Sequence, residues 1–299
     1  LEAGVVFFIP GTPAESVSAL EALKADGFNM IKLASWVWTV PTPESPLYEN
    51  VKTILGWCDA NAVGVWLLHN IQYGSAGEGG DVEAMQDGVT AVARETLLPW
   101  AQALRGHPCV RGVLLGNEVS PGTVALFEDH PRFTTAFRQW LVGVHGNIAT
   151  LNTRWRTQYA DFDAILPADA QAHAAIDVRR FLNSQFALFY SAIVVEVLKP
   201  VLGDEVLYGS KGGASPYILS QMPDYSVCSW DDVLAKWPLW NIKLLCDTTG
   251  RPVFNSELHL YHDEYSFGPA PEVSRYRYLT SALLGEWLTA SFAWGQWKR

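Results

Sequence analysis

The chain has 299 residues, of which 49% are hydrophobic and 17% are charged, and its formal net charge at pH 7 is -10. This length and apolar content suit one large core, either a (β/α)8 barrel, typically of about 250 residues, or a doubly wound domain. The acidic balance, with only 21 Lys and Arg, lacks the clustered positive charge that nucleic-acid binding needs. We expect no membrane partner, because no apolar run in the sequence approaches the roughly 18 residues that span a bilayer.

Short apolar runs alternate with segments of helical apolar spacing in the first part of the chain. Turn residues such as Pro10-Gly11 close the runs. The expected strands are Val5–Ile9, Met30–Leu33, Val63–Leu68 and Val110–Leu115, and the expected helices are Ala14–Asp26, Leu47–Asn61 and Val82–Arg105. Strands that alternate with helices predict a parallel sheet.

The pattern changes between Phe133 and Pro200, where the spacing is helical and no strand is evident. The expected helices in this segment are Phe133–Val144, Ile148–Tyr159 and Ala174–Leu198. After them we expect strands at Val206–Gly209, Ser226–Trp230, Pro252–Asn255 and Ala290–Trp294, and helices at Asp232–Cys246 and Val273–Leu288. The sequence therefore predicts one domain over residues 1–299, an α/β fold of the (β/α)8 TIM-barrel type with an expanded helical connection after strand four and no helix eight.

The four cysteines are widely separated and form neither a CxxC pair nor a Cys/His ligand spacing. They are Cys58, Cys109, Cys228 and Cys246. We expect buried free thiols that behave as small apolar groups, with no metal and no cofactor.

Two of the expected strands lead into a glutamate. Leu115-Gly116-Asn117-Glu118 follows strand four, and Phe254-Asn255-Ser256-Glu257 follows strand seven. A parallel barrel gathers the C-terminal ends of its strands at one face, where its chemistry takes place. A pair of carboxylates is what hydrolysis of a glycosidic bond requires, because one protonates the leaving oxygen and the other attacks the anomeric carbon or activates water. The pattern favours glycoside hydrolysis.

Aromatic and polar residues near the strand ends are candidate sugar contacts. The chain has 13 Trp, and sugars pack their flat C–H faces on indole rings, although core filling explains some of these residues. Structural roles are the alternative for the polar candidates, such as an N-cap for an aspartate at a helix start. The candidates are Trp36, Trp38, His69, Asn70, Trp230, Asp231, His259, Tyr261, Trp294 and Trp297.

The glutamate pair resembles that of the clan A glycoside hydrolases, and the chain looks most like the family 42 β-galactosidases. The resemblance runs from about Phe28 to Trp297. The segments that carry it are Ile31–Thr39, Phe137–Leu141, His145–Thr157, Arg179–Leu182 and Val227–Asp231.

This resemblance implies a retaining, exo-acting β-galactosidase that works by double displacement. Glu257 would be the nucleophile and Glu118 the general acid/base, while Asn117 would hold the 2-hydroxyl of the sugar being released. The implied partner is a β-linked carbohydrate. We expect a soluble protein, cytoplasmic or secreted, and homo-oligomer formation stays open.

The chain also departs from the family pattern. No cysteine cluster of the kind that holds zinc follows Glu118, the loop His69–Gly80 has no arginine for the sugar, and the chain stops at Arg299, before the Glu and His that grip galactose in the family. Two alternatives therefore remain. One is a β-glycosidase or polysaccharide hydrolase of the same clan with another sugar specificity, and the other is a non-catalytic carbohydrate-binding barrel.

Overall fold

The computed structural model describes residues 3–35, 43–69, 71, 89–116, 121, 131–166, 171–211, 216–232, 247–251, 253–259 and 287–291. Within these residues the chain forms one sheet of eight parallel strands in the order β5-β4-β3-β2-β1-β8-β7-β6. The strands are β1 (Ala3–Phe8), β2 (Met30–Ser35), β3 (Gly64–His69), β4 (Val110–Leu115), β5 (Leu207–Ser210), β6 (Cys228–Asp232), β7 (Val253–His259) and β8 (Trp287–Ser291).

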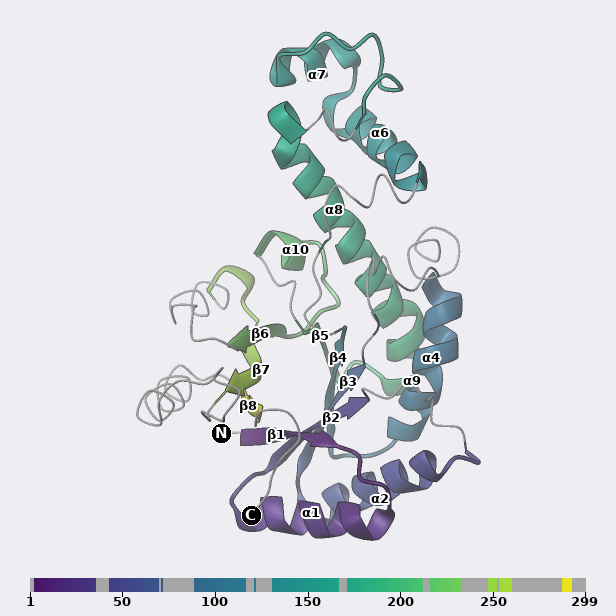
Figure 1. The fold of residues 1–299 in the computed structure, drawn as a ribbon, viewed down its shortest axis with the longest axis vertical. Coiled ribbons are helices and arrows are strands. Elements are labelled where there is room, and N and C mark those ends of the chain that lie inside the picture. The colour runs from purple at the N-terminus through teal and green to yellow at the C-terminus, as the bar shows by residue number, and fades with distance from the viewer. Residues whose placement is uncertain are drawn as a thin grey trace.

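The sheet closes into a ring, which Figure 1 shows in the lower half of the molecule. The two ends of the strand order meet where the backbone N–H groups of Ser226 and Val227 donate to the carbonyl oxygen of Tyr208, at 3.0 and 3.2 Å. Ser226 and Val227 directly precede β6, and Tyr208 lies in β5. The predicted (β/α)8 barrel is therefore confirmed.

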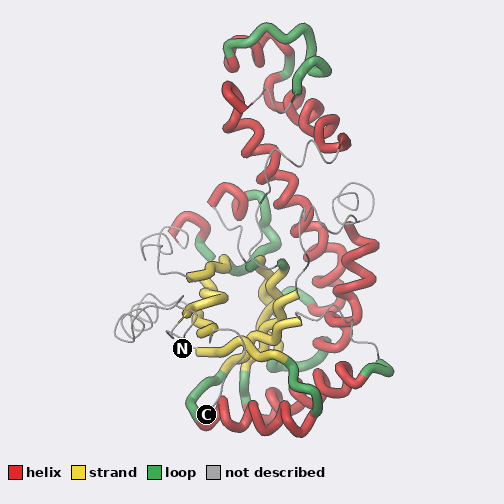
Figure 2. Tube along the Cα trace, in the orientation of Figure 1, coloured by secondary structure: helices red, strands yellow, loops and turns green. Residues whose placement is uncertain are grey.

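Helices lie outside the ring of strands (Figure 2). They are α1 (Pro13–Ala25), α2 (Pro46–Asn61), α4 (Val89–Leu104), α6 (Pro131–His145), α7 (Ile148–Trp155), α8 (Gln171–Ile193), the π-helix η1 (Val194–Leu198), α9 (Lys199–Leu202) and α10 (Pro216–Ser220). Helix α1 begins at Pro13 because Thr12 and Glu15 form a capping box, in which each side chain accepts a hydrogen bond from the other residue's backbone N–H. Helix α2 has Ser45 as its N-cap. Its N-terminal part lies beside that of α1, where Ser16 contacts Asn50.

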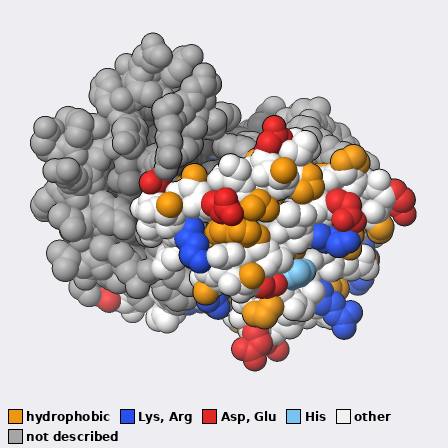
Figure 3. Space-filling view, turned by 90° about the horizontal axis from the view of Figure 1, so that it is seen from below, with side chains coloured by type: hydrophobic (Ala, Val, Ile, Leu, Met, Phe, Trp, Pro, Cys, Tyr) orange, Lys and Arg blue, Asp and Glu red, His pale blue; other side chains and the backbone are white. Residues whose placement is uncertain are grey.

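Helices α1 and α2 pack on each other through a buried polar contact. The Ser16 hydroxyl donates to the Asn50 side-chain oxygen at 2.6 Å, and the Asn50 amide donates to the Pro10 carbonyl at 2.6 Å. This contact ties the loop after β1 to both helices. Their outer surface lies at the bottom of Figure 1 and carries interspersed acidic, basic and apolar side chains (Figure 3).

Both faces of β2, β3, β4 and β5 are largely buried where their side chains are described, which explains their nearly continuous apolar runs. One cluster fills the inside of the barrel and consists of Met30, Trp66, Leu68, Leu114 and Val227. The alternate residues of the same strands, among them Ile31, Leu33, Val65, Leu67 and Val113, pack in the cluster that includes the helices. The interior is tight at Gly112, where an added Cβ would lie 2.3 Å from the Trp66 ring. Glycine at this position leaves the room that the indole ring needs.

The expanded connection after strand four forms an arm that projects from the barrel (Figure 1). We use the name arm for α6, α7 and the N-terminal half of α8. Aromatic rings join its helices, with centroids 5.2 Å apart between Phe137 and Phe181 and 6.2 Å apart between Phe133 and Phe181. The predicted helical connection is confirmed.

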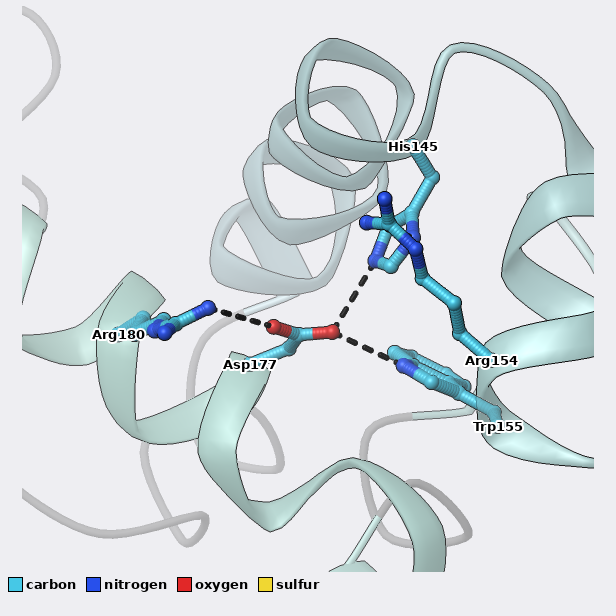
Figure 4. Close-up of polar contacts among 5 residues, drawn as sticks. All are labelled: His145, Arg154, Trp155, Asp177 and Arg180. Atoms are coloured by element: carbon cyan, nitrogen blue, oxygen red, sulfur yellow. Dashed lines mark hydrogen bonds and ion pairs between the residues drawn. The ribbon is translucent and has the colours of Figure 1, made fainter.

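A buried polar cluster also holds the arm together (Figure 4). The Asp177 carboxylate on α8 accepts from His145 Nε2 on α6 at 3.0 Å and from Trp155 Nε1 on α7 at 2.9 Å. Arg180 lies 3.8 Å from the other carboxylate oxygen, and an Arg154 nitrogen lies 3.5 Å from His145 Nδ1. One carboxylate thus links all three helices.

The last part of α8 continues without a break into η1 and α9. The stretch Ala174–Leu202 has 29 residues, and an 18-residue window within it has a mean hydropathy of 1.5, so by length and composition it could cross a membrane. The sequence did not reveal it as such a segment, because charged residues interrupt the apolar run. In the structure it packs against α4, α6 and α10, and the Tyr190 hydroxyl donates to the Ile71 carbonyl at 3.0 Å. Its C-terminal part packs on the barrel, whereas its N-terminal part belongs to the arm.

Several predicted boundaries were wrong. Strand β7 runs to His259, so Glu257 lies inside the strand rather than after it, and β6 includes Asp232, which was assigned to a helix. Strand β8 spans Trp287–Ser291 instead of Ala290–Trp294, because apolar residues lie on both sides and give no boundary signal. The expected helix Val273–Leu288 and the absence of helix eight fall almost wholly outside the described residues.

Candidate active site

Glu257 lies at a point where β7 departs from regular pairing with both neighbours. On one side the pairing with β6 shifts register between Trp230 and Asp231, so that Asp231 pairs with Glu257. On the other side the pairing with β8 shifts between Asn255 and Leu258. Such bulges change the direction of side chains and are frequent beside active sites. The local backbone thus distinguishes Glu257 from an ordinary residue of a barrel strand.

Strand β4 ends in a turn that requires glycine. Gly116 directly follows Leu115, and its φ of 68° is in the region that side chains other than glycine rarely adopt. Its N–H donates to the His69 carbonyl at 2.8 Å, which fixes the turn against the end of β3. Asn117 and Glu118 come next and lie outside the described residues.

Strands β4 and β7 are separated by β5 and β6 on one side of the ring and by the other four strands on the opposite side. Because all strands are parallel, both C-terminal ends lie at the same end of the barrel. The C-terminal ends of β4 and β7 thus lie on different sides of the barrel mouth. This arrangement can bring together two carboxylates that are distant in sequence.

His69 faces the helices rather than the barrel interior. It alternates with Val65 and Leu67, which pack in the helix-side cluster, and it hydrogen-bonds with the Thr96 backbone on α4. Burial lowers the pKa of His69 to about 4, so its ring is neutral at pH 7. This position argues against the sugar contact that the sequence predicted for His69, and we do not include it in the site.

The remaining predicted residues fall into two groups. Trp230 and Asp231 lie in β6 and His259 lies in β7, close to Glu257 along the two strands. Because Asp231 is a strand residue, the alternative that it caps a helix is wrong. The predicted residues that lie outside the described residues are Trp36, Trp38, Asn70, Asn117, Glu118, Tyr261, Trp294 and Trp297.

Two buried lysines in the barrel were not among the predicted site residues. Lys32 and Lys211 each have 1% relative exposure. Lys32 lies in β2, and Lys211 directly follows β5, where its N–H donates to the Leu115 carbonyl at 3.1 Å. A lysine between two apolar residues of a strand, as in Ile31-Lys32-Leu33, is the signal that could have revealed the first.

At the other end of the barrel, Asp59, His107 and Cys109 form a group whose ligand atoms all lie within 4.8 Å of one another. It is the one group of potential metal ligands found among the described residues. The sequence did not reveal it because Asp59 is 48 residues from His107.

The fold is a TIM barrel, and the solved structures that it resembles include glycoside hydrolases. The structure is similar to a beta-galactosidase from Bacillus circulans sp. alkalophilus, with a TM-score of 0.71, 15% identity, and coverage of 98% of this chain and 50% of that chain. It is also similar to an exo-beta-agarase, with a TM-score of 0.65, 16% identity, and coverage of 93% of this chain and 40% of that one. The catalytic domain of a beta-amylase from Paenibacillus polymyxa matches with a TM-score of 0.61, 12% identity, and coverage of 97% and 91%.

Within that class the sequence itself points to one family. Residues 85–206 match the model of glycoside hydrolase family 42, described as beta-galactosidase. The predicted resemblance to this family is therefore confirmed for a segment that includes β4 and the arm. No curated protein sequence matches the chain. The chain spans half or less of the length of the first two solved structures named above.

Proposed function

We propose that this chain is the catalytic barrel of a retaining, exo-acting β-glycosidase, with β-galactosidase activity as the first candidate. The family match and the class of the fold support hydrolysis of a glycosidic bond. The observation that carries the assignment of the site is the bulge that sets Glu257 apart near the C-terminal end of β7.

The proposed reaction is a double displacement. Glu257, ionised, attacks the anomeric carbon while Glu118, protonated, gives its proton to the leaving oxygen. Glu118 then takes a proton from the incoming water, which attacks the glycosyl ester and frees Glu257. Two carboxyl groups about 5 Å apart are required for this retaining route. Asn117 would hold the 2-hydroxyl, and Asp231 and His259, which neighbour Glu257 along the sheet, would contact the sugar.

The first test separates the roles of the two glutamates. Glu257→Gln should lower kcat by at least about 10⁴-fold, because no nucleophile remains. Azide should restore turnover in Glu257→Gly and yield a glycosyl azide of inverted configuration, since the anion attacks from the face that the carboxylate occupied. In Glu118→Ala, azide should instead yield the retained azide, because it attacks the glycosyl-enzyme.

A matched control is Glu21→Gln, which removes one exposed carboxylate on α1, outside the barrel. It should hydrolyse aryl glycosides at the wild-type rate. Wild-type activity in Glu257→Gln, or the same azide product from both glutamate variants, would overturn the assignment.

The identity of the sugar needs a separate experiment. Solved structures with this fold include an exo-beta-agarase and an endo-beta-1,4-mannanase, so a polysaccharide hydrolase of the same clan is the second candidate. A panel of nitrophenyl β-glycosides should show the highest kcat/KM with galactose, and proton NMR should detect the β-anomer first. Preference for an internal cut in a polysaccharide would select the second candidate, and binding without release of nitrophenol would indicate a non-catalytic barrel.

A further inference from the structure

Asp59, His107 and Cys109 converge at the end of the barrel opposite to the candidate active site. Asp59 lies near the C-terminal end of α2, while His107 and Cys109 lie in the turn that leads from α4 into β4. Since this turn precedes the strand, the group lies at the N-terminal end of β4. It is thus independent of the chemistry proposed for the barrel mouth.

Hydrogen bonds already hold the three residues in place. Asp59 Oδ2 lies 2.6 Å from His107 Nδ1, and Asp59 Oδ1 accepts from the Cys109 N–H at 2.8 Å. The Cys109 thiol donates to the Leu55 carbonyl at 3.7 Å. The carboxylate and the imidazole are each about one quarter exposed, whereas the thiol is buried beneath them. An ion could therefore enter from solvent and reach the sulfur.

The three side chains offer a carboxylate oxygen, an imidazole nitrogen and a sulfur, which together are ligands typical of zinc. Zinc bonds sulfur at about 2.3 Å and nitrogen or oxygen at about 2.0 Å, so ligand atoms around a tetrahedral ion lie roughly 3.3 to 3.6 Å apart. The ligand atoms here lie within 4.8 Å of one another. Small rotations of the partly exposed imidazole and carboxylate would bring them to that spacing.

The pKa of the Cys109 thiol argues against nucleophilic catalysis at this group. Burial alone would raise the pKa of Asp59, but hydrogen bonds from Cys109 and His107 lower it below its usual value, so the carboxylate is ionised. Burial raises the pKa of the Cys109 thiol far above its usual value, so without a metal the sulfur keeps its proton and is a poor nucleophile. A bound metal would displace that proton to solvent.

We propose that Asp59, His107 and Cys109 form a binding site for a zinc-type divalent cation, which joins the end of α2 to the start of β4 and leaves a fourth position for water. The ion would replace the Asp59–His107 hydrogen bond with two metal bonds and would bind Cys109 as the thiolate. Its role is to fix the two segments to each other, because it lies far along β4 from the residues that follow Leu115.

Cobalt is the probe for this site, since a Co²⁺–thiolate bond gives a charge-transfer band in the near ultraviolet. Titration of the full chain with Co²⁺ should produce this band with a 1:1 endpoint, together with visible bands of a tetrahedral ion, and Zn²⁺ should displace it. About one proton should be released per metal at neutral pH, from the thiol. Cys109→Ser should abolish the charge-transfer band, and His107→Gln should weaken Co²⁺ binding at least about tenfold.

The matched control is Cys58→Ser, which changes a buried thiol next to Asp59 that does not belong to the group. It should keep the charge-transfer band. Because a buried serine can prevent folding, His107→Gln, at a partly exposed position, supplies the second comparison through its loss of Zn²⁺-induced thermal stabilisation. Absence of the band in the wild type, its persistence in Cys109→Ser, or equal Zn²⁺ stabilisation of wild type and His107→Gln would overturn the proposal.

Discussion

Two regions of this molecule contain the same pair of side chains in different settings. At the N-terminal end of the barrel Asp59 contacts His107 at 2.6 Å, and in the arm Asp177 contacts His145 at 3.0 Å. The barrel pair is about one quarter exposed, whereas the His145 side chain is 2% exposed. The first pair can exchange a hydrogen bond for contact with a solute, and the second cannot do so without opening the arm.

The third partner of each pair increases the difference. In the barrel group it is the Cys109 thiol, which can lose a proton and bind a metal. In the arm it is the Trp155 N–H, which can only donate a hydrogen bond. An aspartate–histidine contact therefore does not define a site. Its access to solvent and the chemistry of its third partner decide whether it is structural or able to bind a ligand.

The largest expected effect comes from breaking the arm cluster. Asp177→Ala leaves the donors of His145 and Trp155 without their shared acceptor and should destabilise the arm by about 3 kcal/mol. Urea unfolding followed by tryptophan fluorescence should show an early transition for the arm. A loss below about 1 kcal/mol would contradict the role given to this carboxylate.

His69 sharpens the comparison, because this partly buried histidine hydrogen-bonds to a backbone group on α4 rather than to a carboxylate in the described part of the chain. Its pKa is lowered from 6.5 to about 4, so the unfolded chain takes up a proton first as the pH falls. The free energy of unfolding should therefore decrease by up to about 3 kcal/mol as the pH falls from 6.5 to 4. Below pH 4, His69 should cause no further decrease. Urea titrations across this range should show a smaller decrease in His69→Gln, and an unchanged slope would argue against a neutral buried ring.

A smaller effect is expected at the barrel pair. Asp59→Asn weakens the contacts to His107 and Cys109 and should cost about 1 kcal/mol at pH 7, because the group is partly exposed. The pKa of Asp59 is lowered in the folded state, so its contribution is present above the unfolded pKa of about 4 and is lost as the pH falls through the folded value. The difference between wild type and Asp59→Asn, measured by urea unfolding, should therefore shrink in acid. A constant difference would contradict this assignment.

An effect as small as that of Asp59→Asn should come from Trp155→Phe, which removes one donor to Asp177 but keeps an aromatic ring against His145. Asp177 still accepts from His145, so the expected loss is about 1 kcal/mol. The same urea experiment should place this variant between wild type and Asp177→Ala. A loss as large as that of Asp177→Ala would mean that the ring, rather than the carboxylate, holds the arm.

The sequence predicted the fold best where the apolar periodicity extended over many residues and where capping residues or glycines marked the ends of helices and strands. The strands before Leu115 and the arm helices were predicted within a few residues, because apolar alternation, capping residues and glycines agree there. Near β7 and β8 no such residues mark the strand ends, and the predicted boundaries of these two strands were wrong. A bulge adds residues without changing composition, so the altered pairing around Glu257 could not be predicted from the sequence.

For the candidate site, Glu257 and its neighbour Asp231 stay predictions from the sequence, which could not predict which way side chains face. His69 shows the reason. Its position at a strand end suggested the barrel mouth, but it lies on the same face of β3 as Val65 and Leu67, which is the face toward α4. The Asp59–His107–Cys109 group was missed for a related reason. Its members are brought together by the packing of α2 against the start of β4, a contact with no local signature.

The pairing of β1 with β8 joins the two ends of the described chain, with Ala3 opposite Leu288. During synthesis β1 to β5 emerge first and can pair in order, whereas β1 must wait for almost the whole chain before its second neighbour exists. Until then its outer edge offers unpaired backbone groups to any other strand. We therefore expect closure of the ring to be a late step of folding, and chains that lack β8 to be the most prone to aggregation.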